Sequence, residues 1–173
     1  MSKTIRVELS NKSINSAIRE IRKYREGLRE KLLRLQARVS EEIAIDAESG
    51  FASAQYDDII GEGPRKPNVT IHWGQSNNMY VVIADGEEAI FVEFGAGVFH
   101  NGAVGSSPHP LGSENGYTIG SFGKGRGKQN AWGYVGDDGE VHITRGTRAQ
   151  MPLYNATKSV ISKIPQIARE VFG

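Results

Sequence analysis

Apolar residues recur every three or four positions along the first third of the chain. They form one stripe, made by Ile14, Ala17, Ile18, Ile21, Tyr24, Leu28, Leu32, Leu35, Val39, Ile43 and Ala47. This spacing predicts an amphipathic helix that is capped by Ser13 and reaches about Phe51, with a kink or break at Gly27. Such a helix would be about 55 Å long, which exceeds the diameter of a domain of this size. Part of it is therefore expected to protrude or to pack on another subunit.

Two later parts of the chain have the pattern of β-hairpins. Residues 68–73 and 79–84 are strand-like around a polar turn, and residues 132–135 and 140–144 flank Gly136-Asp137-Asp138-Gly139. Residues 87–94 fit either a short helix or a third strand. A last helix is predicted to open at Met151-Pro152, with a kink at Pro165.

Glycine and proline mark the expected connections. Ser49-Gly50 and residues 61–67 are expected to separate the first helix from the first hairpin. Residues 95–129 are rich in glycine and lack any period, which predicts a long, flexible loop inserted into a single domain of residues 1–173. The stretch from Phe91 to Gly97 is expected to be the hinge at which this loop begins.

The net charge of +1 does not by itself indicate nucleic acid or an anionic membrane as a partner. The local distribution is uneven, since residues 19–38 hold eight basic and three acidic side chains, whereas residues 41–58 hold six acidic ones and no lysine or arginine. One interpretation is a solvated helix with ion pairs four residues apart. The other is charge complementarity between copies that pack head to tail.

Candidate chemistry is sparse. The chain has no cysteine, which excludes disulfides and cysteine-zinc sites. No export signal is expected from the first residues, and no apolar run is long enough to span a bilayer. The run Gly123-Lys124-Gly125-Arg126-Gly127-Lys128 lacks the spacing of a phosphate-binding loop. It is interpreted as a basic loop tip, with contact to nucleic acid or to an acidic protein surface as the alternative.

The pattern of histidines and carboxylates does not indicate a catalytic site. His100 and His109 could meet in a folded loop, with Asp137 or Asp138 as further ligands of a metal, but simple polar roles are favoured. Glu93 has no second carboxylate at a spacing that suits acid–base chemistry. No enzymatic activity and no cofactor are expected.

Two segments carry a family resemblance. Residues 89–97, Ala-Ile-Phe-Val-Glu-Phe-Gly-Ala-Gly, and residues 144–156, Thr-Arg-Gly-Thr-Arg-Ala-Gln-Met-Pro-Leu-Tyr-Asn-Ala, resemble the gene-ten-like tail-component family of long-tailed phages of the HK type. In that family an apolar segment ending in Val-Glu-Phe-Gly-Thr-Gly precedes a glycine-rich loop, and a Pro-Ala-Gln-Pro-Phe-Leu-like segment opens the closing helix. Here Ala96 replaces the usual threonine, and the insert from Val98 to Gln129 is long.

The resemblance implies a structural virion protein of the phage neck or the head-proximal tail end, which acts in head–tail joining or tail completion. It implies a homo-oligomeric ring, expected to be six-fold in the virion, that is assembled in the host cytoplasm and docks on connector or stopper proteins and on tail-tube or tail-terminator proteins. Non-specific contact with genomic DNA is a further expectation, and membrane contact is not expected. The expected interaction residues are Phe91, Glu93, Phe94, Gly95, Lys124, Arg126, Lys128, Met151 and Pro152.

The predicted fold is α+β, with the long N-terminal helix and the C-terminal helix packed on a small, mainly antiparallel sheet, plus the glycine-rich loop. Phe91 and Phe94 should anchor the loop in the core, and Glu93 should orient it or contact another subunit. The alternative function is a nucleic-acid-binding or regulatory protein that uses the basic helix and loop. A hydrolase built around His100, His109 and the Asp137-Asp138 turn is a third reading.

Overall fold

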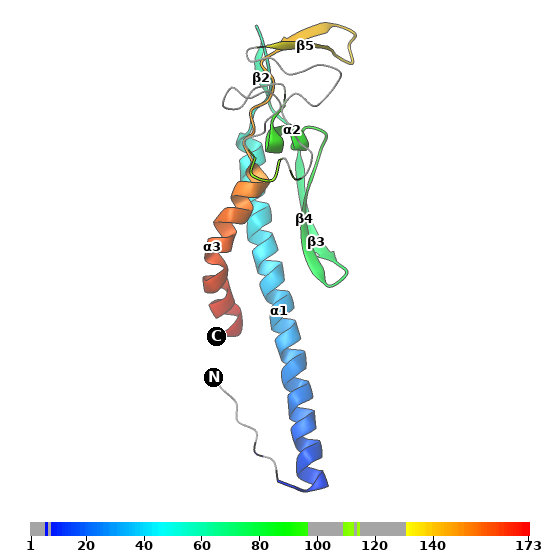
Figure 1. Ribbon diagram of the computed structural model, residues 1–173, viewed down its shortest axis with the longest axis vertical. Coiled ribbons are helices and arrows are strands. Elements are labelled where there is room, and N and C mark those ends of the chain that lie inside the picture. The colour runs from blue at the N-terminus through cyan, green and yellow to red at the C-terminus, as the bar shows by residue number, and fades with distance from the viewer. Residues whose placement is uncertain (1–5, 7, 97–108, 113, 115–130) are drawn as a thin grey trace.

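The computed structural model describes residues 6, 8–96, 109–112, 114 and 131–173. Figure 1 shows an elongated molecule in which the N-terminal helix α1 is the spine. The C-terminal helix α3 lies along one side of α1, and a β-hairpin lies along the other. A second small sheet sits at the end of the molecule where α1 finishes. The predicted α+β class, with two packed helices and antiparallel strands, is confirmed.

Helix α1 comprises Asn11–Ser53 and is about 64 Å long at 1.5 Å per residue. Its cap is Ser10, whose side chain accepts a hydrogen bond from the backbone nitrogen of Ser13 at 3.2 Å. The Ser13 hydroxyl instead accepts from the backbone nitrogen of Glu8, so the predicted cap is wrong by three residues. The helix is unbroken at Gly27, and the break expected there is also wrong.

Helix α3 comprises Pro152–Phe172 and runs antiparallel to α1. Its last turn lies beside Lys31, whose ammonium group donates to the carbonyl oxygen of Phe172 at 3.1 Å. Its first residue, Pro152, lies so close to Gly50 that a Cβ atom on Gly50 would be 2.8 Å from the proline Cβ. Gly50 therefore does not end α1, as the sequence suggested, but lets the two helices approach. The helix continues past Pro165.

The strands form two separate sheets rather than one. The four-stranded antiparallel sheet has the order β2-β1-β6-β5, made by Gly63–Arg65, Tyr56–Ile59, Val141–Thr144 and Trp132–Val135. The other sheet is the hairpin of β3 (Thr70–Ser76) and β4 (Met79–Asp85). Both predicted hairpins are confirmed, whereas the short strands β1 and β2 were not predicted.

The core lies where α1, the β3–β4 hairpin and the short helix α2 (Ala89–Phe94) meet. Its buried members are Phe51, Ala54, Ala89 and Val92, and Leu153 from α3 packs against them. This small cluster fixes α2 against both long helices. Among the described residues, no helix combines the length and the apolar character that crossing a membrane requires.

Candidate functional site

The two segments that carry the family resemblance meet in one joint, which we call the α2–α3 junction. It consists of α2 with Gly95 and Ala96, and of residues 147–154 at the start of α3. The backbone nitrogens of Gln150 and Met151 both donate to the carbonyl oxygen of Val92, at 2.8 and 3.4 Å. Ala96 and Thr147 exchange two backbone hydrogen bonds of 2.8 Å each. The predicted residues Glu93, Gly95 and Pro152 are thus close in space.

Glu93 supplies the cap that the start of α3 lacks. The residue at the N-cap position, Met151, makes no side-chain capping bond. The Glu93 carboxylate instead accepts hydrogen bonds from the backbone nitrogens of Leu153 and Tyr154, at 2.9 Å each. These are the amides that an N-cap side chain ordinarily satisfies, and the positive end of the helix dipole favours an anion there.

The side chain of Glu93 is only 5% exposed. A buried carboxylate is costly unless hydrogen bonds offset its desolvation, and the two helix amides with one histidine provide them. Its described contacts join α2 to the start of α3, which fits the predicted orienting role, and the predicted contact with another subunit stays a prediction. The sequence suggested both roles without deciding between them.

His109 is the third partner of Glu93. Its Nε2 atom lies 3.1 Å from Glu93 Oε1, and its Nδ1 accepts a hydrogen bond from the backbone nitrogen of Leu111 at 3.0 Å. Since Nδ1 is an acceptor, Nε2 carries the proton and donates it to the carboxylate in this arrangement. The His109 ring also contacts Phe94, with ring centroids 4.4 Å apart, and Tyr154. One point of the predicted insert is thereby fixed to the α2–α3 junction, with Phe94 as the expected anchor.

Phe91 and Gly95 complete the junction. Phe91 stacks on Tyr56 with ring centroids 6.1 Å apart, so it links α2 to β1. Gly95 has φ 83° and ψ 156°, a combination that essentially only glycine adopts. A Cβ atom at Gly95 would also lie 3.1 Å from the backbone nitrogen of Ala149. The predicted hinge residue is therefore a tight crossing point.

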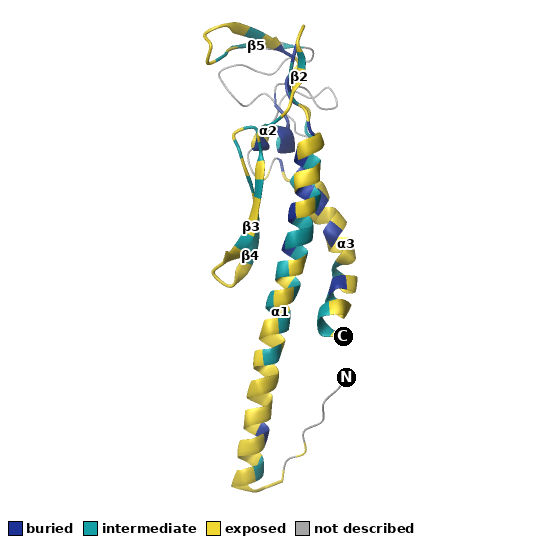
Figure 2. Ribbon diagram, turned by 180° about the vertical axis from the view of Figure 1, so that it is seen from behind, coloured by how far each residue is buried: buried dark blue, intermediate teal, exposed yellow. Residues whose placement is uncertain are grey.

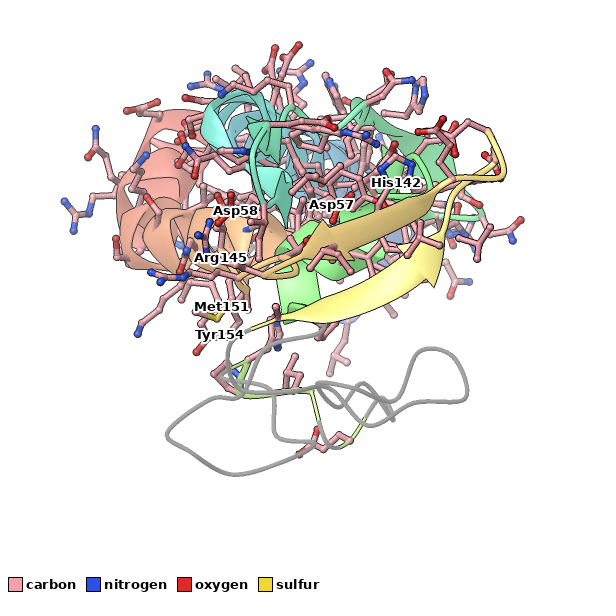
Figure 3. The ribbon with its side chains drawn as sticks, turned by 90° about the horizontal axis from the view of Figure 1, so that it is seen from above. Asp57, Asp58, His142, Arg145, Met151 and Tyr154 are labelled. Carbon is pink, nitrogen blue, oxygen red and sulfur yellow. The ribbon has the colours of Figure 1, made fainter. Side chains whose placement is uncertain are left out.

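A second polar cluster lies on the four-stranded sheet. Asp57 is buried with a positive φ of 46°, and its backbone nitrogen donates to the hydroxyl of Thr147 at 3.0 Å. The phenol of Tyr134 on β5 donates to Asp57 Oδ2 at 2.5 Å. Beside it, Arg145 and Asp58 form an ion pair of 3.1 Å, and Figure 3 labels both residues together with Asp57. This cluster ties the sheet to the α2–α3 junction through Thr147, and no sequence pattern predicted it.

Burial, followed by the hydrogen bond to Asp57 and its charge, raises the pKa of Tyr134 from 10 to about 12. The folded protein therefore keeps this proton at a pH at which the unfolded chain loses it. The stabilisation is complete below pH 10 and is lost as the pH rises to about 12. Because burial also raises the pKa of Tyr56, we expect late tyrosinate formation in an ultraviolet absorbance titration whose amplitude is smaller in Tyr134→Phe. A late step of unchanged size in that variant would contradict the assignment.

The candidate metal and catalytic residues that the structure describes pair separately with different carboxylates. His109 is paired with Glu93, whereas His142 lies 2.9 Å from Asp138. The backbone amide of Glu140 and then the His142 side chain lower the pKa of Asp138. In the part of the chain that the structure describes, no three His, Asp or Glu side chains are placed to hold a metal ion. His100, and the basic residues Lys124, Arg126 and Lys128, lie outside the described residues.

The arrangement at the α2–α3 junction is suited to positioning. Each carboxylate oxygen of Glu93 accepts a helix amide, and the histidine beside it is held at both ring nitrogens. Comparison of the chain with family models, with curated proteins and with solved structures finds no match.

Proposed function

We propose that the protein is a structural subunit of a phage neck or of the head-proximal end of a phage tail, acting in head–tail joining or tail completion. The observation that carries the proposal is the α2–α3 junction. The two segments that resemble the phage family are about fifty residues apart in the chain, yet they are hydrogen-bonded to each other through Val92, Glu93 and Ala96. Their similarity to the family thus falls on one structural element and not on two unrelated loops.

The shape of the subunit supports the same proposal. Helix α1 extends past the end of α3, beyond Lys31, and Figure 2 shows this part of the helix largely exposed. A protruding helix is of little use to an isolated domain of this size but is suited to contacts in an assembly. On this proposal the subunits form a homo-oligomeric ring, the ring docks on connector and tail proteins, and Lys124, Arg126 and Lys128 would contact DNA phosphates.

The alternative is a nucleic-acid-binding protein. The observation that favours it is the basic part of α1, in which Arg22, Arg25 and Arg29 are exposed. Such a protein would bind duplex DNA as a monomer, with an affinity that falls steeply as salt is raised. The structural proposal requires assembly into particles, so the two functions have different experimental signatures.

The test is electron microscopy of lysates from a phage whose copy of this gene is interrupted. We expect filled heads and separate tails, and we expect a plasmid-borne wild-type gene to restore joined particles. Joined, infectious particles in the absence of the protein would contradict the proposal. Failure to package or replicate DNA, with normal joining of the particles that remain, would favour the nucleic-acid alternative.

A further inference from the structure

The protruding half of α1 carries a row of large apolar side chains, which we call the N-terminal stripe. Its members are Ile14, Ile18, Ile21, Leu28 and Leu32, and they are between 38% and 56% exposed. Helix α3 ends beside Lys31, so it does not cover residues 11–30 of α1, a stretch about 30 Å long that holds the stripe as far as Leu28, and Leu32 lies level with the end of α3. An exposed apolar row of this kind on a helix is typical of a surface that another protein covers.

The charges around the N-terminal stripe restrict what can cover it. Arg25 falls within the row, and Arg22 and Arg29 lie along one side of it by helical spacing. None of the three forms an ion pair with another described residue. Two N-terminal stripes packed on each other would bring arginine against arginine, which is unfavourable. The complementary surface should therefore be acidic with an apolar centre.

The other half of α1 offers such a surface, which we call the acidic patch. It consists of Glu41, Ile45 and Glu48, which are spaced for one side of the helix. Ile45 is 58% exposed, and the two glutamates form no ion pair among the described residues. The neighbouring acidic residues differ, because Glu42 and Asp46 are both within reach of Lys163 on α3. The acidic patch is thus the part of the acidic segment left available for another molecule.

The two surfaces point in different directions. Ile45 comes thirteen residues after Leu32, which is about 3.6 turns, so the acidic patch and the N-terminal stripe lie on roughly opposite sides of α1. A two-fold dimer would need both surfaces on the side facing its partner. Surfaces at opposite ends and on opposite sides instead suit a heterologous contact, which each added copy can repeat.

We propose that copies of this chain associate head to tail, with the N-terminal stripe of one copy packed on the acidic patch of the next. The inference deepens the proposed function, on which it rests for the closure of the contact into a ring. The contact itself is argued from exposure, charge and helical position, and it can be measured on the purified chain alone.

The apolar part of the contact is tested by Ile21→Ser, with Ile161→Ser as the matched control. The two isoleucines are both in helices and are 56% and 58% exposed, but Ile161 lies on α3 outside both surfaces. Sedimentation velocity over a wide range of concentration should show self-association of the wild type. Ile21→Ser should weaken it about tenfold, whereas Ile161→Ser should leave it unchanged. Circular dichroism checks that both variants keep their helix content.

The charged part of the contact is tested by two double variants and their mixture. In Arg22→Glu with Arg29→Glu, the two positions beside the N-terminal stripe become acidic, like the acidic patch. In Glu41→Arg with Glu48→Arg, the acidic patch becomes basic, like the flank of the N-terminal stripe. Each variant alone should be a monomer because like charges meet at every contact. Mixed in equal amounts they should form mixed oligomers, since each contact then joins opposite charges.

Three results would overturn the inference. They are a wild type that stays monomeric at every concentration, an Ile21→Ser variant that associates as strongly as the wild type, and charge variants that fail to assemble when mixed. None of these decides the proposed function, which is judged by head–tail joining in the phage. Conversely, a chain that passes all three tests but is not needed for joining would keep the inference and lose the proposed function.

Discussion

Replacing Glu93 by alanine is expected to lower the free energy of unfolding by about 3 kcal/mol or more. The change removes the acceptor of the Leu153 and Tyr154 amides at the start of α3, and it leaves the buried Nε2–H of His109 without its carboxylate. Glu93→Gln keeps one oxygen acceptor and should lose less. Urea unfolding followed by circular dichroism measures both.

Glu62→Ala is the matched control for this prediction. The side chain of Glu62 is 63% exposed and only reaches Arg65 at 3.9 Å. Its removal should change the free energy of unfolding by less than about 0.5 kcal/mol. If Glu93→Ala were as mild as Glu62→Ala, the carboxylate would not hold α2 and α3 together.

Alanine at Gly95 is expected to destabilise the fold by about 2 kcal/mol or more. The backbone there adopts φ 83° and ψ 156°, which alanine resists, and the added Cβ would lie 3.1 Å from the backbone nitrogen of Ala149. The same substitution at Gly27 should have the opposite sign. Gly27 lies inside α1 with open space around it, so alanine should stabilise the protein by about 0.5 to 1 kcal/mol.

Comparing the two glycine variants isolates the effect of backbone conformation on stability, because both replace glycine by alanine. Thermal or urea unfolding of both variants is compared with the wild type. Equal effects of the same sign at Gly95 and Gly27 would mean that the crossing at Gly95 is not tight. The predicted opposite signs of the two stability changes follow from the backbone geometry at each glycine, and they do not depend on what the protein binds.

Periodicity predicted the elements that are long or strongly patterned. The stripe from Ile14 to Ala47 gave α1, and alternation with a polar turn gave the β3–β4 hairpin. The errors fall where a local signal had a tertiary cause. Glycine is typical of a helix end, but at Gly50 the missing side chain makes room for Pro152. Gly27 weakens helix propensity, but one glycine does not break a helix of this length.

The candidate site was predicted in part. Its residues were found through their resemblance to a family, but their roles depend on contacts between distant segments. No local pattern indicates that Glu93 caps a helix that begins near residue 152, or that His109 from the insert completes the arrangement. The same holds for the Asp57–Tyr134 hydrogen bond, which joins residues seventy-seven positions apart. Pairings of this kind need the fold before they can be seen.

The α2–α3 junction and the long helix α1 together give a chain with a hydrogen-bonded joint and two oppositely charged surfaces on one helix. The joint sets how α3 lies along the C-terminal half of α1, where Arg38 reaches Glu170. This packing covers one side of α1 and leaves Ile45 exposed. The internal contacts thus determine which surfaces of α1 stay exposed, and this connects the stability predictions to the proposed assembly.

The most direct measurement is electron microscopy, with mass determination, of the purified protein alone and mixed with the connector and tail-end proteins of the same phage. The account predicts closed rings built from several copies of this chain, either alone or on the addition of those proteins, and fewer rings in Ile21→Ser at the same protein concentration. A protein that stays a monomer both alone and with those proteins, and that binds duplex DNA tightly, would contradict the account.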